Sequence, residues 1–334
     1  MNEEPNAIEV LNLRKSFGNL TAVKSVSFTV KRRQVVGFIG ANGAGKTTTM
    51  RILATLELPT AGTVKIEGID VVDFPELVRH RIGWMPDHFG TYDNVTVWEY
   101  LDFYARAYGL LAGDRERRLK EVMEFTDLAS IADRDMNRLS TGMGQRLCLG
   151  RTLLSDPGVL ILDEPAAGLD PKARIEFKNL IRLLAEQGKT IFISSHILSE
   201  LDEMCDALLF IDHGEIVHFG QTAALKTNSS EAVFNVQVEG PPEALYAWIR
   251  HQGNLNVKLL DRHRTGGRLV MPAAMANEAG GMLRRMIGDG IPVCQFHREE
   301  RRLEEAFVEM LRGGQAAPLP VPEPHERAAP ADSS

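Results

Sequence analysis

A glycine-rich segment with a single lysine has the spacing of a phosphate-binding loop. Residues 40–47 read Gly-Ala-Asn-Gly-Ala-Gly-Lys-Thr and follow the apolar segment 35–39. Small residues let successive backbone N–H groups curve around an anion, and the helix expected from Lys46 offers its positive end. Lys46 can reach terminal phosphates and Thr47 can ligate Mg²⁺. The pattern predicts a nucleotide phosphate site, the alternative being a glycine-rich turn that binds nothing.

Two adjacent carboxylates end a second apolar run, at residues 159–162. An apolar strand that ends in a carboxylate would place Asp163 beside the phosphates, as a ligand of the metal or of its water. Glu164 could accept a proton from the attacking water, a role that contributes roughly 10²- to 10⁴-fold. Two acids that merely end a strand are the alternative, which the upstream loop disfavours.

Patterns of apolar residues indicate the elements that position these groups. Short β segments are expected at residues 8–13, 26–30, 35–39 and 63–67. Helical periodicity occurs at residues 97–124 and 147–154, and the unbroken apolar runs are at 159–162 and 190–193. Such runs are typical of strands buried on both faces of a parallel sheet, so the class is α/β. The basic run 31–33 indicates a solvated hairpin between two strands.

A change of composition at residues 226–230 predicts a domain boundary. Residues 231–313 have the order βαββαβ followed by a helix at about 301–312. This order matches a ferredoxin-like unit and favours a small α+β accessory domain. It shows no catalytic cluster, so an interaction or regulatory role is expected. The Pro- and Ala-rich residues 314–334 are predicted to be a disordered tail.

Composition narrows the functional classes. The net charge is −7, which argues against a protein that neutralises nucleic acid or anionic lipid. Cys148, Cys205 and Cys294 lie far apart, so neither a zinc site nor a disulfide framework is expected, and a reducing cytosol fits best. No run approaches the roughly 18 apolar residues that span a bilayer. A membrane role would therefore need a partner chain, without direct lipid insertion.

Further motifs give the chain its resemblance to a known family. Residues 139–146, Leu-Ser-Thr-Gly-Met-Gly-Gln-Arg, precede an apolar helix and resemble the signature motif of ABC ATPases. With the loop, the paired acids, the turn 167–170 and the Ser-Ser-His at 194–196, they make residues 6–225 similar to an ABC transporter nucleotide-binding subunit. The resemblance implies a P-loop ABC-type ATPase domain with a β-subdomain, a mainly parallel RecA-like core and a helical subdomain at about residues 88–155.

The resemblance implies ATP and Mg²⁺ as ligands and assigns roles to the motif residues. Glu164 would be the catalytic base, His196 would contact the γ-phosphate and hold the attacking water, and Lys46 would assist catalysis. The remaining nucleotide-binding residues would be Phe17, Gly40, Asn42, Gly43, Ala44, Gly45, Thr47, Thr48, Asp87, Ser140, Gly142, Asp163 and Asp170. The metal ligands among them would be Thr47, Asp87 and Asp163.

The same resemblance implies that one chain makes half a site. Ser140 and Gly142, at a helix N-terminus, would cap the γ-phosphate bound by a second copy of the subunit. Asp170 would lie in the intersubunit turn that couples the two sites. Phe17 would stack on adenine, with a core phenylalanine as the alternative.

Three positions depart from the common family pattern. Asp87 stands where a glutamine is usual, which adds a negative charge near phosphate. Thr141 and Met143 replace the commonest Gly and Gln, and Gly144 leaves no side chain where many relatives carry a basic one.

Eight aromatic residues gather in residues 84–108. Some of them belong in the core of a helical subdomain, but the surplus suggests an apolar groove that receives a helix of another protein. In the resembled family this groove docks a separate transmembrane permease, and we expect Phe89 and Tyr92 to contribute. The chain would then be cytoplasmic and peripheral at the inner face of the cell membrane.

The sequence is most similar to the type-two exporter branch, which exports drugs, lipids or polysaccharides. An importer subunit is the alternative within transport. A DNA-repair ATPase would carry a long insert where only about 95 residues separate loop and signature, and a translation factor usually carries two cassettes. A nucleotide-gated regulator is the remaining alternative.

Overall fold

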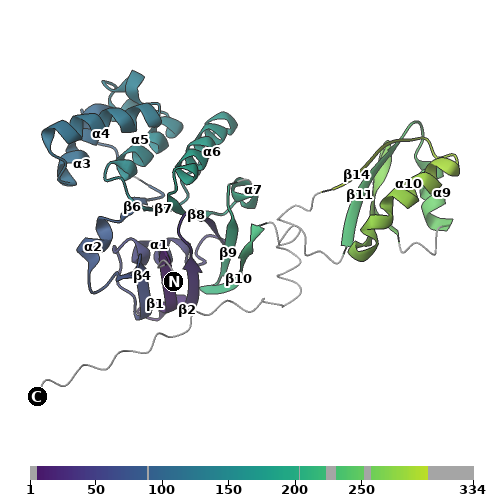
Figure 1. Ribbon diagram of the computed structural model, residues 1–334, viewed down its shortest axis with the longest axis horizontal. Coiled ribbons are helices and arrows are strands. Elements are labelled where there is room, and N and C mark those ends of the chain that lie inside the picture. Colours follow the sequence, from purple (N-terminus) through teal and green to yellow (C-terminus); the bar gives the residue numbers. More distant parts are fainter. Residues whose placement is uncertain (1–5, 89, 203, 223–230, 252–256, 300–334) are drawn as a thin grey trace, which may run out of the picture. The chain divides into compact units, whose positions relative to one another are not determined.

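The computed structural model describes residues 6–88, 90–202, 204–222, 231–251 and 257–299 of the chain (Figure 1). The chain divides into two compact units, with the division between Gln221 and Thr222. Each unit has its own hydrophobic core, formed by residues between 7 and 211 in unit 1 and between 232 and 291 in unit 2.

An antiparallel sheet in the order β2-β1-β4-β5 begins unit 1. Its first strand continues beyond the apolar pattern to Phe17, because pairing with the next strand extends through exposed polar residues as far as Phe17 opposite Leu20. The strands are β1 (Ile8–Phe17), β2 (Leu20–Val30), β4 (Ala61–Ile66) and β5 (Ile69–Asp70).

A second sheet has the order β10-β9-β3-β8-β7-β6, with all neighbours parallel except the edge strand β10. The strands are β3 (Val35–Ile39), β6 (Ile82–Met85), β7 (Val159–Leu162), β8 (Thr190–Ser195), β9 (Ala207–Asp212) and β10 (Glu215–Gln221). Strands β3, β7 and β8 are buried along their whole length, as their unbroken apolar runs predict. Their carboxyl ends meet at one edge, where the phosphate loop, the paired acids and His196 follow.

Three phenylalanines join the two sheets. The Phe192 ring stacks on Phe28 with centroids 5.6 Å apart and lies 5.1 Å from Phe38. The predicted hairpin at the basic run 31–33 is wrong, because β2 and β3 belong to different sheets. Strand β3 is apolar on both faces and takes a central place in the parallel sheet, so residues 31–33 cross between sheets.

Three helices form a separate group beside the sheets, at the upper left of Figure 1. They are α3 (Val97–Ala107), α4 (Ala112–Phe125) and α5 (Thr141–Leu153). Thr96 and Glu99 form a capping box at the start of α3, and Gly109, with φ +80°, separates it from α4. The 3₁₀ turns η1 (Ala129–Ile131) and η2 (Met136–Arg138) lead into α5. Helix α5 starts six residues before the apolar pattern because its first turns are polar and glycine-rich.

Four further helices belong to the described part of unit 1. They are α1 (Lys46–Leu53), α2 (Pro75–Arg79), α6 (Pro171–Glu186) and α7 (Leu198–Leu201). Asp170 caps α6: its carboxylate accepts a hydrogen bond from the Ala173 N–H at 2.9 Å, and Pro171 lies in the first turn.

Unit 2 is an antiparallel sheet in the order β12-β13-β11-β14 with helices on one face. Its elements are β11 (Glu231–Val238), α9 (Glu243–His251), β12 (Lys258–His263), β13 (Gly266–Pro272), η3 (Ala273–Glu278), α10 (Ala279–Gly288) and β14 (Val293–Arg298). The βαββαβ order matches the expectation. Alternate residues of β11 pack with Trp248 of α9 and Met286 of α10.

Several expectations fall on residues outside those described. They are Phe89, the helix at 301–312 and the tail 314–334. None of the helices in the described part of the chain is long and apolar enough to span a bilayer.

Candidate active site

The loop between β3 and α1 has the conformation that a bound phosphate group needs. Gly43 and Gly45 have φ of +82° and +109°, which other residues rarely adopt. A Cβ on Gly45 would lie 2.7 Å from the Ala22 carbonyl oxygen, and one on Gly40 would lie 2.4 Å from the Ile211 carbonyl oxygen. No side chain caps the first turn of α1, so its N–H groups stay available to an anion.

Lys46 is folded back across this loop. Its side chain is buried, and Nζ donates hydrogen bonds to the Gly40 carbonyl at 2.7 Å and the Ala41 carbonyl at 3.4 Å. Nζ also lies 3.3 Å from Glu164 Oε1. The ammonium group is therefore already held at the mouth of the loop, beside Glu164, which follows β7.

Asp163 is completely buried at the end of β7 and is incompletely satisfied. Its Oδ1 accepts a hydrogen bond from Ser194 Oγ at 2.6 Å, whereas Oδ2 has no hydrogen-bond partner among the described residues. Burial raises the pKa of Asp163, the nearby hydroxyls of Ser194 and Thr47 oppose this, and the charges of Asp87 and Glu164 raise it further. A cation beside Oδ2 would reverse this shift and complete the coordination of the oxygen, so these residues fit a divalent metal.

Glu164 connects the loop to the end of β8. Its backbone is left-handed, with φ +47°, which is unusual for a glutamate. Its Oε2 lies 2.8 Å from His196 Nδ1, and its carboxylate is largely buried between this imidazole and Lys46. The structure thus brings together three side chains that are far apart in the sequence, Lys46, Glu164 and His196.

Ser194 has a part in this arrangement that the motifs did not reveal. Its hydroxyl donates to Asp163 Oδ1 and accepts the Glu164 N–H at 2.8 Å, so one buried group fixes both acids. The sequence signal was a hydroxyl residue near the end of a buried apolar strand next to the strand of Asp163. The motif Ser-Ser-His was noted, but only its histidine received a role.

The signature residues lie at the start of α5 and pack against α6 of the same chain. Ser140 is exposed and accepts a hydrogen bond from the Met143 N–H at 3.3 Å. A Cβ on Gly142 would lie 3.1 Å from that of Ala173, so this glycine permits a close approach of the two helices. Asp170, the cap of α6, is also exposed. Ser140 and Asp170 are therefore accessible to another molecule, whereas Gly142 is half-buried against α6.

Two other predicted residues lie on the surface. Phe17 is 46% exposed at the end of β1, so it is not a core residue, and Lys15 Nζ lies 4.6 Å above its ring. Asp87 is exposed in the loop after β6, and its carboxylate accepts the His88 N–H at 2.9 Å. Of the loop residues, Asn42 and Thr47 are exposed, Ala44 is buried and Thr48 is half-buried.

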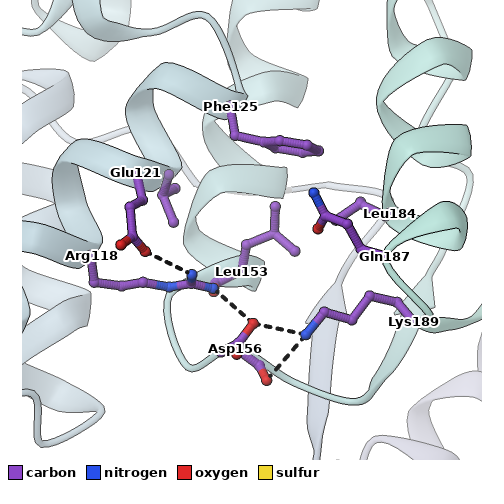
Figure 2. Close-up of a pocket in the computed structure, with 9 residues that line it drawn as sticks. Arg118, Glu121, Phe125, Leu153, Asp156, Leu184, Gln187 and Lys189 are labelled. Atoms are coloured by element: carbon purple, nitrogen blue, oxygen red, sulfur yellow. Dashed lines mark hydrogen bonds and ion pairs between the residues drawn. The ribbon is translucent and has the colours of Figure 1, made fainter.

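A cavity of about 230 Å³ lies elsewhere in unit 1, between α4 and the end of α6 (Figure 2). Asp156 accepts hydrogen bonds there from Arg118 at 3.1 Å and from Lys189 at 2.7 Å. Asp156 and Lys189 precede β7 and β8, so the cavity is at the amino ends of the parallel strands. The candidate site is at their carboxyl ends.

Comparisons with known proteins agree with this geometry. Residues 23–167 match the ABC transporter family. The Nod factor export ATP-binding protein I of Ralstonia nicotianae is 38% identical over 66% of this chain and 69% of that protein. The uncharacterized ABC transporter ATP-binding protein YxlF of Bacillus subtilis is 32% identical over 91% of this chain and 99% of that protein. A solved dimeric bacterial ABC transporter cassette is 27% identical with a TM-score of 0.60, and the match covers 64% of this chain and 98% of that one.

Proposed function

The chain belongs to the ABC transporter ATP-binding proteins, ATPase subunits that power a separate permease, and from this premise we propose that Glu164 is its catalytic base. The observation that supports this most is the position of the Glu164 carboxylate, 3.3 Å from Lys46 and 2.8 Å from His196. A base must lie within hydrogen-bond reach of its proton source, and a water between this acid and the phosphate loop satisfies that condition.

The loop residues bind the ATP phosphates. The backbone N–H groups of residues 40–48 and the amino end of α1 surround the anion, and Lys46 exchanges its contacts with loop carbonyls for contacts with phosphate oxygens. Asp163 Oδ2 and the Thr47 hydroxyl would hold Mg²⁺, and Asp87 would contribute an oxygen. When bound, Mg²⁺ would neutralise the charge that develops on the phosphates. Phe17 offers its exposed ring to adenine.

Each residue of the catalytic group then has a separate task. Glu164 accepts the proton of the attacking water, while His196 contacts the γ-phosphate and holds the water in place. The Glu164 N–H bond to Ser194 keeps the base oriented, because both are fixed to the rigid strands β7 and β8. Orientation by such rigid elements lowers the entropic cost of reaching the transition state.

A second copy of the chain completes the site. Ser140 and Gly142 cap the γ-phosphate that the other copy binds, and Asp170 lies between the two copies. The exposure of Ser140 and Asp170 supports this, since neither is enclosed by its own chain. The solved bacterial cassette to which the chain is similar is dimeric.

The transport partner is a permease, and the direction is export. Tyr92, Trp98, Phe103 and Tyr108 are 51%, 44%, 63% and 42% exposed on and beside α3, where a permease helix docks. A relative covering two thirds of this chain is a Nod factor export protein, which supports export. Docking on a permease places the chain at the inner face of the cell membrane.

Replacement of the base tests the proposal. Glu164→Gln is expected to lower the steady-state rate of ATP hydrolysis at least about 100-fold while ATP affinity is retained, because the phosphate-binding groups remain. Dimers should accumulate with ATP and Mg²⁺, as measured by light scattering. Lys46→Ala is the contrasting variant, since it should weaken ATP binding itself. Substantial turnover by Glu164→Gln would contradict the assignment.

A further inference from the structure

A buried acid connects the two segments that flank the proposed catalytic group. Glu200, in α7, is 5% exposed, although nothing in the proposed chemistry uses it. Its Oε2 accepts a hydrogen bond from Ser195 Oγ at 2.7 Å, and its Oε1 lies 3.1 Å from Nε of Arg174 on α6. A buried carboxylate is stable only when its charge is compensated, so Arg174 and Glu200 hold each other in place.

On one side, this pair reaches the backbone around His196. The Ser195 hydroxyl has one proton and donates it to Glu200. Its oxygen accepts the Ile197 N–H at 3.0 Å. The bond between Ile197 and Ser195 spans His196, and the bond between Ser195 and Glu200 anchors this short loop to α7. Glu200 therefore fixes the backbone that carries the imidazole.

On the other side, the pair reaches the turn before α6. The Arg174 guanidinium donates a hydrogen bond from its second nitrogen to the Leu169 carbonyl at 3.1 Å. Leu169 lies between Gly168, with φ +73°, and Asp170, which caps the helix. Arg174 can make both contacts at once because its guanidinium presents several N–H groups in a fixed plane. A lysine at this position would make only one of them with the same geometry.

We propose that Arg174 and Glu200 are positioning residues that couple the turn 167–170 to His196. The chain of contacts runs from the Leu169 carbonyl through Arg174, Glu200 and Ser195 to the backbone of His196. When a second copy presses on the exposed turn, the rigid pair transmits the displacement and sets the position of the imidazole at the γ-phosphate. This inference rests on the proposed function, because it uses the roles given to His196 and to the dimer contact.

The coupling predicts a loss of turnover without a loss of nucleotide binding. In the full-length chain, Arg174→Met should lower kcat for ATP about tenfold or more, since residues in one network of contacts act together. The KM and the equilibrium affinity for ATP should stay within about twofold of the wild type, because Arg174 touches no residue of the phosphate loop. Glu200→Gln removes the charge and keeps the shape, so it provides the same test if Arg174→Met folds poorly.

A double-mutant cycle tests whether Arg174 and Ser195 act through the same series of contacts. Ser195→Ala should also lower kcat, and the double variant Arg174→Met with Ser195→Ala should be no slower than the slower single variant. Residues that act through one another give such non-additive effects. Additive losses would show two independent roles and overturn the coupling.

Arg118→Met is the matched control for a merely structural role. Arg118 also joins a backbone carbonyl, that of Leu153, to a carboxylate, that of Asp156, but it does so at the opposite ends of the strands (Figure 2). Arg118→Met should lower the melting temperature about as much as Arg174→Met does, because each substitution removes an ion pair between an arginine and a carboxylate. It should nevertheless leave kcat within about twofold of the wild type. An equal fall of kcat in Arg118→Met and Arg174→Met would overturn the proposal, as would an unchanged kcat in Arg174→Met.

A failure of the proposed coupling can be told apart from a failure of the proposed function. If Glu164→Gln hydrolyses ATP as fast as the wild type, the assignment of the base fails. If Glu164→Gln is inactive but Arg174→Met is fully active, the base stands and only the coupling is refuted.

Discussion

Glu164 adopts a backbone conformation that a glutamate does not favour, and its neighbours hold it there. The left-handed φ of +47° costs of order 1 kcal/mol, which the Ser194 bond to its N–H and the contacts with Lys46 and His196 offset. In return, the carboxylate turns from the end of β7 toward the phosphate loop. The strain at this residue thus places the base where the proposed chemistry needs it.

Removal of the Ser194 hydroxyl should disturb the positions of both acidic residues, Asp163 and Glu164. Ser194→Ala leaves the buried Asp163 carboxylate with one partner fewer and leaves the Glu164 N–H unpaired. Since a hydrogen bond to a charged group is worth about 1.5–3 kcal/mol, kcat should fall roughly 10- to 100-fold. Steady-state ATPase assays measure this. Ser194→Thr, which keeps the hydroxyl, should recover most of the activity, and a fully active alanine variant would refute the role.

Helix α1 and its preceding loop form an element whose geometry depends on one glycine. Gly45 combines a φ of +109° with a carbonyl oxygen 2.7 Å from the place of a Cβ. The helix can begin there only because Gly45 lacks a side chain, and the start of the helix determines where its N–H groups point.

Gly45→Ala is therefore expected to abolish ATP binding and to lower the free energy of unfolding by about 1–3 kcal/mol. Equilibrium binding and urea unfolding measure the two effects. Gly109→Ala is the control, because Gly109 has φ +80° but open space around the position of a Cβ. It should lose some stability and bind ATP normally. Unchanged ATP affinity in Gly45→Ala would contradict the steric argument.

The carboxylate of Asp156 connects helix α4 to the segments that precede β7 and β8 (Figure 2). Partial burial raises its pKa, but the hydrogen bond and charge of Lys189, together with Arg118, outweigh burial and hold the pKa below its ordinary value of 3.8. Because the pKa is lowered in the folded protein, the ion pairs of Asp156 stabilise the fold at pH values above its ordinary pKa of 3.8. This stability is lost as the pH falls from there through the lowered pKa.

Asp156→Asn should consequently flatten the acid limb of the stability profile. As the pH falls below about 4, the wild type should lose about 0.2–1 kcal/mol more than the variant, the size expected for ion pairs of an exposed carboxylate. Urea unfolding at a series of pH values measures the difference. Parallel profiles for the two proteins would show that Asp156 does not contribute.

Over the whole molecule, the two units have separate hydrophobic cores. The core of unit 1 contains described residues between 7 and 211, and that of unit 2 contains described residues between 232 and 291. Unit 1 carries every residue of the proposed nucleotide site. Such a division is typical of domains that fold independently.

A fragment of residues 1–221 should therefore fold and bind ATP without unit 2. Its ATP affinity should remain within about threefold of the full chain, and it should unfold in one cooperative transition, as expected for a domain with its own core. Calorimetry and equilibrium binding measure these properties, with Lys46→Ala in the same fragment as the non-binding control. Aggregation of the fragment or loss of ATP binding would show that unit 1 depends on unit 2.

The sequence alone determined the parts of this protein that are local along the chain. The phosphate loop could be identified because its eight consecutive residues combine glycines, a lysine and a threonine after an apolar strand, and such a segment sets its own geometry. The buried strands β3, β7 and β8 could be located because a strand enclosed on both faces must be apolar throughout. The chemical roles of the motif residues are predicted from the sequence for the same reason.

Only the tertiary structure decided the contacts between distant residues. Ser194 meets Glu164, and Arg174 meets Glu200, because strand order and helix packing bring separate segments together. The run 31–33 crosses between sheets for a similar reason, since the pairing partner of β3 is chosen by the whole sheet. No local pattern of residue types encodes such pairings, because their free energy comes from burial and alignment that exist only once the chain has folded.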